Sequence, residues 1–178
     1  MSMREEGARD NRRNAQAGAL CISASWLAKM NLNQLTGNIG LFYACYQLSL
    51  RGWNALPTIR NAKGADVIGV KGKRKLGIQV KALSKPNAVP LGRGALDESV
   101  DFWVVIINVR DDIKREVFVI PQKDILRGLQ ECSQDNVYKD FVSRSKDNEG
   151  GFTYWLGHNF LASGQHNYTD AWEYLEDE

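Results

Sequence analysis

Apolar residues recur between residues 39 and 50 at the three- and four-residue spacing of a helix. They fall into two series, Ile39, Phe42, Tyr46 and Leu50 in one and Leu41, Cys45 and Leu48 in the other. Thr36 or Asn38 is expected to cap the start of this helix, and Gly52 is expected to end it. Because the two series together cover much of the circumference, the pattern predicts a helix that is well buried.

Shorter apolar runs after the helix predict strands. Two strand-like stretches surround a basic turn at residues 71–75, and runs rich in Val and Ile on both sides of residues 110–115 predict a second hairpin. Residues 102–109 are apolar except for Asn108 and do not alternate, which is typical of a strand that is buried on both faces. A helix is predicted directly after Pro121.

The two ends of the chain are less regular. Residues 135–151 are polar and are expected to form loops, and the aromatic segment after them is expected to give a short strand or loop and a closing amphipathic helix. Residues 1–30 look like a peripheral N-terminal extension, which leaves residues 31–178 as a single domain. The order of the elements predicts a compact α/β sandwich with a mixed sheet.

Composition indicates one globular domain and favours one cellular compartment. A chain of 178 residues with 43% hydrophobic and 25% charged residues is long enough for one packed domain and short for two. Cys21, Cys45 and Cys132 are widely spaced and odd in number, which favours reduced thiols and a cytoplasmic location over a disulfide framework. With only two histidines a structural zinc site is not expected, and no apolar run is long enough to span a membrane.

Charge is distributed unevenly along the chain. Residues 51–94 carry ten Lys and Arg side chains against a single acid, Asp66, whereas the last nine residues carry five carboxylates and no cation. This asymmetry indicates a surface that faces a polyanion, and a solvated, lysine-rich hairpin is the alternative. The candidate nucleic-acid-binding residues are Arg60, Lys63, Lys71, Lys73, Arg74, Lys75 and Lys85.

Three polar side chains in the first hairpin are candidates for chemistry. Gln79 and Lys81 are two residues apart on one predicted strand, so they share a face. Asp66 joins them only if strand pairing places it opposite one of the two. A symmetric five-residue turn at residues 71–75 would instead place it opposite Val80, so convergence requires a different loop length or a bulge.

Residues 37–121 resemble the PD-(D/E)xK nuclease superfamily, the restriction-endonuclease-like fold that includes Holliday-junction resolvases. The likeness rests on a helix entered through a Gly-rich turn, on "GAD" before one strand and "QVK" in the next, and on the hairpin that follows. It implies a three-layer sandwich with a central mixed β-sheet flanked by helices. It also implies Asp66, Gln79 and Lys81 as catalytic residues, and Asp66, Gln79 and Val80 as ligands of Mg²⁺ or Mn²⁺.

The resemblance implies DNA as the partner and a homodimer as a candidate assembly, and the chemistry agrees with the residue types. Hydrolysis of a phosphodiester needs a hard cation, and Mg²⁺ prefers one or two carboxylates together with water and substrate oxygens. A lysine beside such a site, here Lys81, is a compact charge that can hold the attacking water or a phosphoryl oxygen. The cations at residues 71–75 would follow the phosphate backbone without reading sequence.

Two departures from the superfamily pattern count against activity. Gln79 replaces the second acid, and Leu41 stands where the superfamily often has a helix glutamate, with no Asp or Glu in residues 11–65 to replace it. Losing one charged ligand, worth about 2–3 kcal/mol, weakens metal binding roughly 30- to 100-fold. Asp101 could supply an acid from the next strand, but we expect it to begin that strand at the surface.

Three interpretations of Asp66 therefore stay open. The protein is a weakened metal-dependent nuclease that acts on DNA, or a non-catalytic nucleic-acid-binding protein of the same fold. In the third, Asp66 is a turn residue paired with Lys81 or Arg60, an exposed contact that would contribute little to stability.

Overall fold

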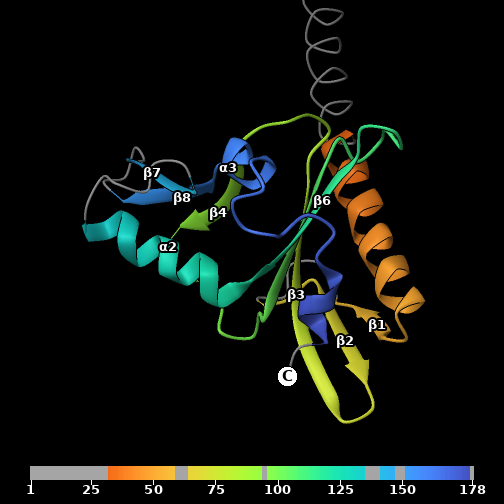
Figure 1. Ribbon diagram of the computed structural model, residues 1–178. Coiled ribbons are helices and arrows are strands. Elements are labelled where there is room, and N and C mark those ends of the chain that lie inside the picture. Colours follow the sequence, from red (N-terminus) through yellow and green to blue (C-terminus); the bar gives the residue numbers. More distant parts are fainter. Residues whose placement is uncertain (1–31, 59–63, 94–95, 135–140, 147–150, 177–178) are drawn as a thin grey trace, which may run out of the picture. The chain divides into compact units, whose positions relative to one another are not determined.

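The computed structural model describes residues 32–58, 64–93, 96–134, 141–146 and 151–176 (Figure 1). The chain divides into two compact units, residues 1–35 and 36–178. Of the first unit only residues 32–35 are described, and they are helical. The helix covers residues 32–50 in all, and its residues 36–50 belong to the second unit.

The second unit is built around a mixed sheet of five strands. Their order across the sheet is β1-β2-β3-β5-β6, with β3 and β5 parallel and the other neighbours antiparallel. The strands are β1 (Asn54–Pro57), β2 (Val67–Lys71), β3 (Arg74–Ala82), β5 (Phe102–Ile107) and β6 (Glu116–Pro121). The predicted hairpin around residues 110–115 is confirmed as β5 and β6, and β5 is buried on both faces as expected.

A smaller antiparallel sheet and three short helices complete the unit. The small sheet has the order β4-β8-β7. Its strands and the helices are β4 (Val89–Arg93), β7 (Val142–Lys146), β8 (Phe152–Leu156), α2 (Gln122–Gln134), α3 (His158–Ala162) and the 3₁₀ helix η2 (Trp172–Leu175). The helix predicted after Pro121 is confirmed as α2. Among the described residues, no helix combines the length and apolar character needed to cross a membrane.

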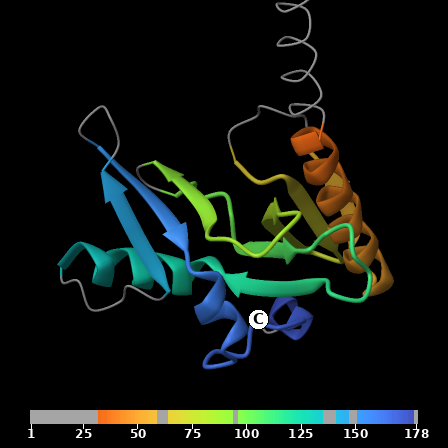
Figure 2. The ribbon, with the colours of Figure 1, turned by 90° about the horizontal axis from the view of Figure 1, so that it is seen from above.

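Two apolar clusters cover the two faces of the large sheet. On one face, Ala44 and Leu48 of the helix pack with Ile78 and with η2. On the other face, Trp103 packs with residues of α2, α3 and the small sheet, and Figure 2 shows the long helix on one side of the sheet and α2 on the other. The unit is therefore a three-layer α/β sandwich with a central mixed sheet, which is the predicted fold class.

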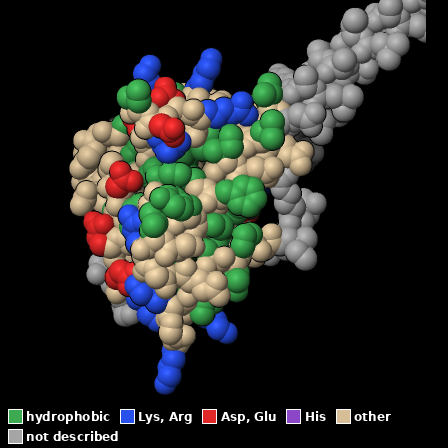
Figure 3. Space-filling view, turned by 90° about the vertical axis from the view of Figure 1, so that its right-hand side faces the viewer, with side chains coloured by type: hydrophobic (Ala, Val, Ile, Leu, Met, Phe, Trp, Pro, Cys, Tyr) green, Lys and Arg blue, Asp and Glu red, His purple; other side chains and the backbone are tan. Residues whose placement is uncertain are grey.

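The long helix is less buried than predicted. Phe42 and Leu50 are 64% and 63% exposed, and Ile39 and Tyr46 of the same series are exposed as well; Figure 3 shows apolar side chains gathered on this face. The helix contacts the sheet along its other side, where a Cβ on Gly40 would lie 2.4 Å from the Cβ of Ala82. Periodicity identified both apolar series, but only the series beside Gly40 packs on the sheet.

Three local predictions are wrong. Thr36 and Asn38 lie inside the helix rather than at its start, and the closing helix is only the four residues of η2. Residues 142–146, predicted as loop, form β7, because Val142 is fully buried while the polar residues after it lie on an edge strand of the small sheet. The predicted end of the helix at Gly52 is confirmed by a φ of 82° in the turn that follows.

Candidate active site

The turn between β2 and β3 is shorter than predicted. Lys71 pairs with Arg74, so the loop contains only Gly72 and Lys73 rather than the five residues 71–75. Gly72 has a φ of 62°, a left-handed conformation that glycine adopts without steric cost at the first position of a two-residue hairpin loop. The basic residues beside Gly72 and Lys73 are therefore paired strand residues.

This short turn brings Asp66, the residue before β2, beside Gln79. Val67 pairs with Ile78, and the main-chain N–H of Asp66 donates to the same Ile78 carbonyl at 2.9 Å, so Asp66 and Val67 both lie against Ile78. The paired register ends there, and the side chains of Asp66 and Gln79 meet directly, because Nε2 of Gln79 donates to Oδ2 of Asp66. The loop length differs from the five-residue turn, as convergence of these side chains requires.

The carboxylate of Asp66 is held by β3. Its Oδ2 accepts a hydrogen bond from the main-chain N–H of Val80 at 2.8 Å and another from Nε2 of Gln79. The Asp66 main chain is also fixed from β1, because the N–H of Thr58 donates to the Asp66 carbonyl at 2.9 Å and its Oγ1 donates to the Ala65 carbonyl at 2.8 Å. The position of this acid therefore follows from main-chain hydrogen bonds with two neighbouring segments, Thr58 directly after β1 and strand β3.

Lys81 shares the face of Gln79, and its ammonium lies over an aromatic ring. Its Nζ is 5.6 Å from the ring centroid of Trp103, the residue of β5 that lies beside Gln79 in the parallel register. Trp103 is itself fixed, because its Nε1 donates to Oε1 of Gln122 at 3.0 Å. No ion pair joins Lys81 to Asp66, and Arg60, the other suggested partner of Asp66, lies outside the described residues.

Sequence reasoning did not identify Trp103 and Gln122 as neighbours of the site. Trp103 is almost fully buried, and it reaches Lys81 through the parallel pairing of β3 with β5. Gln122 is buried at the start of α2 and also donates from Nε2 to the Asp97 carbonyl at 2.8 Å. Long-range pairing of this kind leaves no local pattern in a sequence.

The oxygen atoms around Asp66 suit a hard cation in kind. Ile78 directs its carbonyl toward β2, so Val80, two residues further along β3, directs its N–H and carbonyl to the same side, beside Asp66. The Gln79 carboxamide presents its nitrogen to Asp66, and rotation of the amide by half a turn would present its oxygen instead. Carboxylate and carbonyl oxygens are the ligands that Mg²⁺ and Mn²⁺ prefer, although this set carries only one negative charge.

Asp66 does not belong to a cluster of three metal-binding side chains in the part of the chain that the structure describes. Within the described ranges, no three His, Cys, Asp or Glu side chains come close enough together to hold a metal by themselves. Leu41 packs against the cluster on the helix side of the sheet, whereas Gln79 and Lys81 face the other side. A metal held by Asp66, Gln79 and Val80 would have neutral oxygens and water as its other ligands.

Asp101 has a structural role at the start of β5, and its predicted place before that strand, at the surface, is confirmed. Its Oδ2 accepts a hydrogen bond from the Gly77 N–H at 2.7 Å, and its own N–H donates to the Gly77 carbonyl at 2.7 Å. A side chain at Gly77 would collide with this segment, because its Cβ would lie 1.8 Å from the carbonyl oxygen of Ser99. Asp101 thus holds the main chain of β3 at Gly77, and its carboxylate binds there rather than at Asp66.

The predicted nucleic-acid-binding cations separate into distinct groups. Lys73 and Lys75 are exposed near the turn, and Lys75 shares the face of Gln79. Lys85 is exposed beyond the opposite end of β3, four residues after Lys81. Arg60 and Lys63 lie outside the described residues.

Lys71 and Arg74 lie on the other face of the hairpin, where the C-terminal acid Glu176 meets them. The Nζ of Lys71 is 2.8 Å from Oε1 of Glu176, and this contact lowers the pKa of the Glu176 carboxyl below its usual value. Figure 1 shows η2 beside the β2–β3 hairpin. The sequence carries a general signal for this contact, the acidic C-terminus set against the basic hairpin, but it does not identify Glu176.

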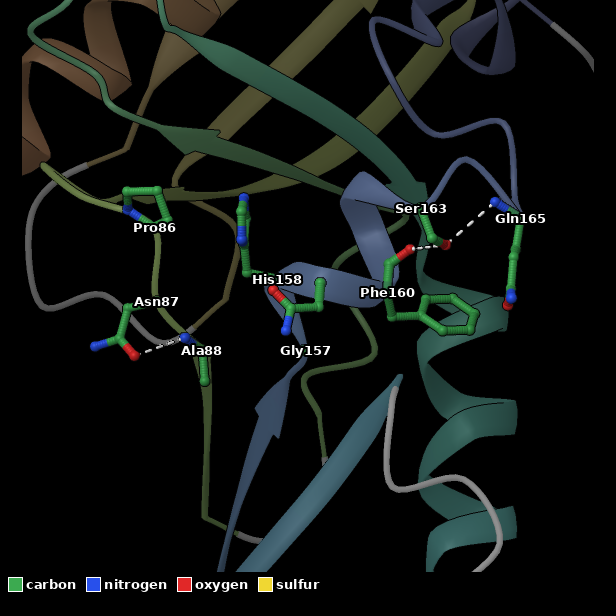
Figure 4. A pocket seen from close by; sticks show the side chains of 9 residues that line it. Pro86, Asn87, Ala88, Gly157, His158, Phe160, Ser163 and Gln165 are labelled. Carbon is green, nitrogen blue, oxygen red and sulfur yellow. Dashed lines mark hydrogen bonds between the residues drawn. The ribbon is translucent and has the colours of Figure 1, made fainter.

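A pocket of about 600 Å³ lies elsewhere, between residues 86–88 and α3 (Figure 4). Its lining contains none of Asp66, Gln79 and Lys81. His158, which lines it, is already paired through Nε2 with Oε2 of Glu116 at 2.7 Å. The pocket therefore brings no additional chemistry to the candidate site.

Comparisons with known proteins give little further information. No known protein family matches the chain, and no curated protein matches it. Among solved structures, that of a bacterial homing endonuclease, I-Ssp6803I, is similar over 80% of this chain and 91% of its own chain, with 14% sequence identity and a TM-score of 0.46. A likeness this distant supports no inference about what the present chain does.

Proposed function

We propose that the chain is a metal-dependent nuclease of the PD-(D/E)xK type that acts on DNA phosphodiester bonds. The observation that carries the proposal is the contact between Asp66, the residue before β2, and Gln79 of β3, with Lys81 on the face of Gln79. The fold brings a carboxylate, an amide and an ammonium from separate sequence positions into one cluster. A contribution to stability does not account for this arrangement. Such partly exposed polar contacts contribute little to folding.

Each residue has a role that its surroundings support. Asp66, the Gln79 carboxamide and the Val80 carbonyl would hold Mg²⁺ or Mn²⁺, which when bound stabilises phosphoryl charge and activates water. Lys81 would orient that water or contact a phosphoryl oxygen, and its ammonium lies over the ring of Trp103. With one carboxylate in the set, metal binding is expected to be weak and Mn²⁺ to support activity at lower concentration than Mg²⁺.

A second candidate function is binding of nucleic acid without cleavage. The observation that favours it is the hydrogen bond from Gln79 to Asp66, which occupies one carboxylate oxygen with a neutral amide. The exposed cations Lys73, Lys75 and Lys85 would serve either function, because contacts to phosphates position a protein on nucleic acid whether or not it cleaves.

Cleavage of both strands of a duplex needs two such sites, so we extend the proposal to a homodimer. The exposed series Ile39, Phe42 and Tyr46 on the long helix has the alternating three- and four-residue spacing of paired helices, and residues 36–50 carry no charge. A second copy of the chain would match this uncharged stripe with its own. Equilibrium sedimentation of the protein beside Phe42→Glu tests this, and equal masses for the two would contradict it.

We also propose the cytoplasm as the location. Cys45 and Cys132 are free thiols, and the reducing cytoplasm is the compartment in which such cysteines persist.

The decisive experiment compares cleavage and binding in one set of samples. The purified protein is incubated with supercoiled, linear, branched and single-stranded DNA in Mg²⁺ and in Mn²⁺, beside Asp66→Ala and Lys81→Ala. Glu173→Ala and Lys114→Ala serve as matched controls, because both side chains are exposed and lie outside the site. We expect cleavage to fall about 100-fold or more in the two site variants, as the loss of a catalytic group predicts, and to persist in the controls.

The other outcomes are equally informative. Salt-sensitive binding without cleavage by the unmodified protein favours the non-cleaving binder. Cleavage that survives in Asp66→Ala would contradict the proposed site, and the absence of both binding and cleavage would contradict both functions.

A further inference from the structure

The carboxylate of Glu176 lies among side-chain donors of Trp53 and Lys71. Lys71 Nζ contacts both carboxylate oxygens, Oε1 at 2.8 Å and Oε2 at 3.0 Å, and Trp53 Nε1 donates to Oε1 at 3.0 Å. The guanidinium of Arg74 reaches the main-chain carbonyl of Glu176 at 3.3 Å. An ammonium and an indole N–H thus bind one carboxylate, and a guanidinium binds the main-chain carbonyl of the same residue.

These donors are held in place by contacts other than Glu176. Lys71 Nζ also donates to the Arg51 carbonyl at 2.9 Å, and the charged groups of Lys71 and Arg74 lie 5.7 Å and 5.4 Å from a ring centroid of Trp53. Trp53 is itself buried in the helix-side cluster. The arrangement is therefore expected to persist when the carboxylate leaves.

The carboxylate can leave without disturbing the fold. Trp172 and Leu175 anchor η2 in the core, whereas Glu176, the next residue, is exposed. The side chains of Lys71 and Glu176 are 39% and 43% exposed, and an ion pair with that much access to water is weak. Rotation of one side chain would free Lys71 Nζ and the Trp53 indole N–H while η2 stays packed and Arg74 keeps its main-chain contact.

A phosphate has the properties that this cluster of donors accepts. It is an anion with several acceptor oxygens, and hydrogen bonds from Lys and Arg to phosphate are stronger than those between neutral groups. We propose that Trp53, Lys71 and Arg74 form a phosphate-binding site for nucleic acid, and that Glu176 occupies this site until a phosphate displaces it. This inference rests on the proposed function in one respect, the binding of nucleic acid.

The site is separate from the position of cleavage. The Lys71–Arg74 pair lies five residues along β3 from Gln79, which corresponds to about 16 Å of strand. The pair also lies on the opposite face of the hairpin from Gln79. Occupation by Glu176 should therefore change the affinity for nucleic acid and leave the cleavage chemistry unchanged.

The test is the binding of a short labelled duplex DNA by fluorescence anisotropy over a range of salt concentrations. Glu176→Gln is compared with Glu173→Gln, an exposed residue of η2 whose substitution removes the same charge. We expect Glu176→Gln to bind about two- to fivefold more tightly than Glu173→Gln, the factor that corresponds to an exposed ion pair. The slope of log affinity against log salt should be nearly the same in the two variants, because Lys71 contacts a phosphate in the complex of each.

A double-mutant comparison locates the effect on Lys71. Lys71→Ala should weaken DNA binding more in the Glu176→Gln background than in the unmodified protein, because only in that background is Lys71 free beforehand. The indole N–H signal of Trp53 in NMR spectra, assigned with Trp53→Phe, should shift when DNA is added. Its shift would show directly that the partner of this group has changed.

The outcomes separate the two proposals. If DNA binds but Glu176→Gln and Glu173→Gln have equal affinities, the role of Glu176 is wrong and nucleic-acid binding stands. If the Trp53 signal stays unchanged at saturating DNA, the phosphate site is wrong. If none of these proteins binds DNA even at low salt, nucleic-acid binding itself is wrong.

Discussion

The two ends of the β2–β3 hairpin hold charged groups in different ways. At the Asp66 end, the carboxylate is fixed by main-chain hydrogen bonds and by strand register, and the groups around it belong to neighbouring strands. At the turn end, Lys71 meets Glu176, which is 105 residues away, through exposed side chains. The first arrangement depends on backbone geometry and the second on the number of charges. Substitutions should therefore have large effects at the Asp66 end and small, additive effects at the turn end.

The largest effect is expected at Gly77, which supports the Asp66 end. In Gly77→Val the new Cβ would lie 1.8 Å from the Ser99 carbonyl oxygen, and backbone atoms can yield only by moving the strand. We expect a loss of about 3 kcal/mol or more in unfolding free energy, measured by urea denaturation. Gly37→Ala is the control, because nothing lies within 4 Å of the added methyl group, and it should be neutral or stabilising. Equal midpoints for Gly77→Val and the unmodified protein would contradict this packing.

Asp101→Ala should have the next largest effect. The substitution leaves the Gly77 N–H without its carboxylate acceptor, a bond to a charged group that contributes about 1.5–3 kcal/mol. Thermal unfolding measures the loss, and Asp101→Asn, which keeps an acceptor oxygen, should restore part of it. Cleavage per folded molecule should remain, so an inactive but fully stable Asp101→Ala would instead assign this acid to the chemistry.

At the turn end, each exposed cation should give a smaller and additive effect. Lys73→Ala and Lys75→Ala should each reduce the slope of log affinity against log salt by about 0.9 if each side chain contacts one phosphate. The rate of cleavage at saturating DNA should stay unchanged, and Lys114→Ala, an exposed lysine on the β5–β6 loop, should change neither quantity. A lower rate at saturation would show that the two ends are not independent.

The smallest effect is the pH dependence of the Glu176 contact. Lys71 lowers the pKa of this carboxyl in the folded protein, so the contact stabilises the fold fully above the unfolded pKa, about 4.3. The stabilisation is lost as pH falls through the folded pKa. Melting temperatures of the unmodified protein and Glu176→Gln should differ slightly at neutral pH and converge in acid. A difference that grows in acid would have the wrong sign for this contact.

The sequence predicted those features that depend on neighbouring residues. The burial of β5, the β5–β6 hairpin and α2 follow from continuous or periodic apolar runs, and all three are confirmed. The shared face of Gln79 and Lys81 follows from strand alternation. Whether Asp66 joins Gln79 and Lys81 depends on the length of the β2–β3 turn. The run of cations around Gly72 does not reveal that length.

The remaining features depend on contacts that are remote in sequence. Whether Phe42 or Leu48 faces the sheet is decided by the close approach of Gly40 to Ala82, which periodicity does not contain. The hydrogen bond from Trp53 to Glu176 joins residues 123 positions apart. Such pairs become visible only when the chain is folded.

The two-residue turn has a consequence for how the hairpin can vary in length. Five residue pairs separate the turn from Asp66, one residue of each pair on each strand. Adding one residue to both arms would carry the cations farther out and keep Asp66 beside Gln79. Adding one residue to a single arm would give Asp66 a different partner and turn it toward the opposite face from Lys81. The hairpin can therefore become longer or shorter, but its two strands must change in length together.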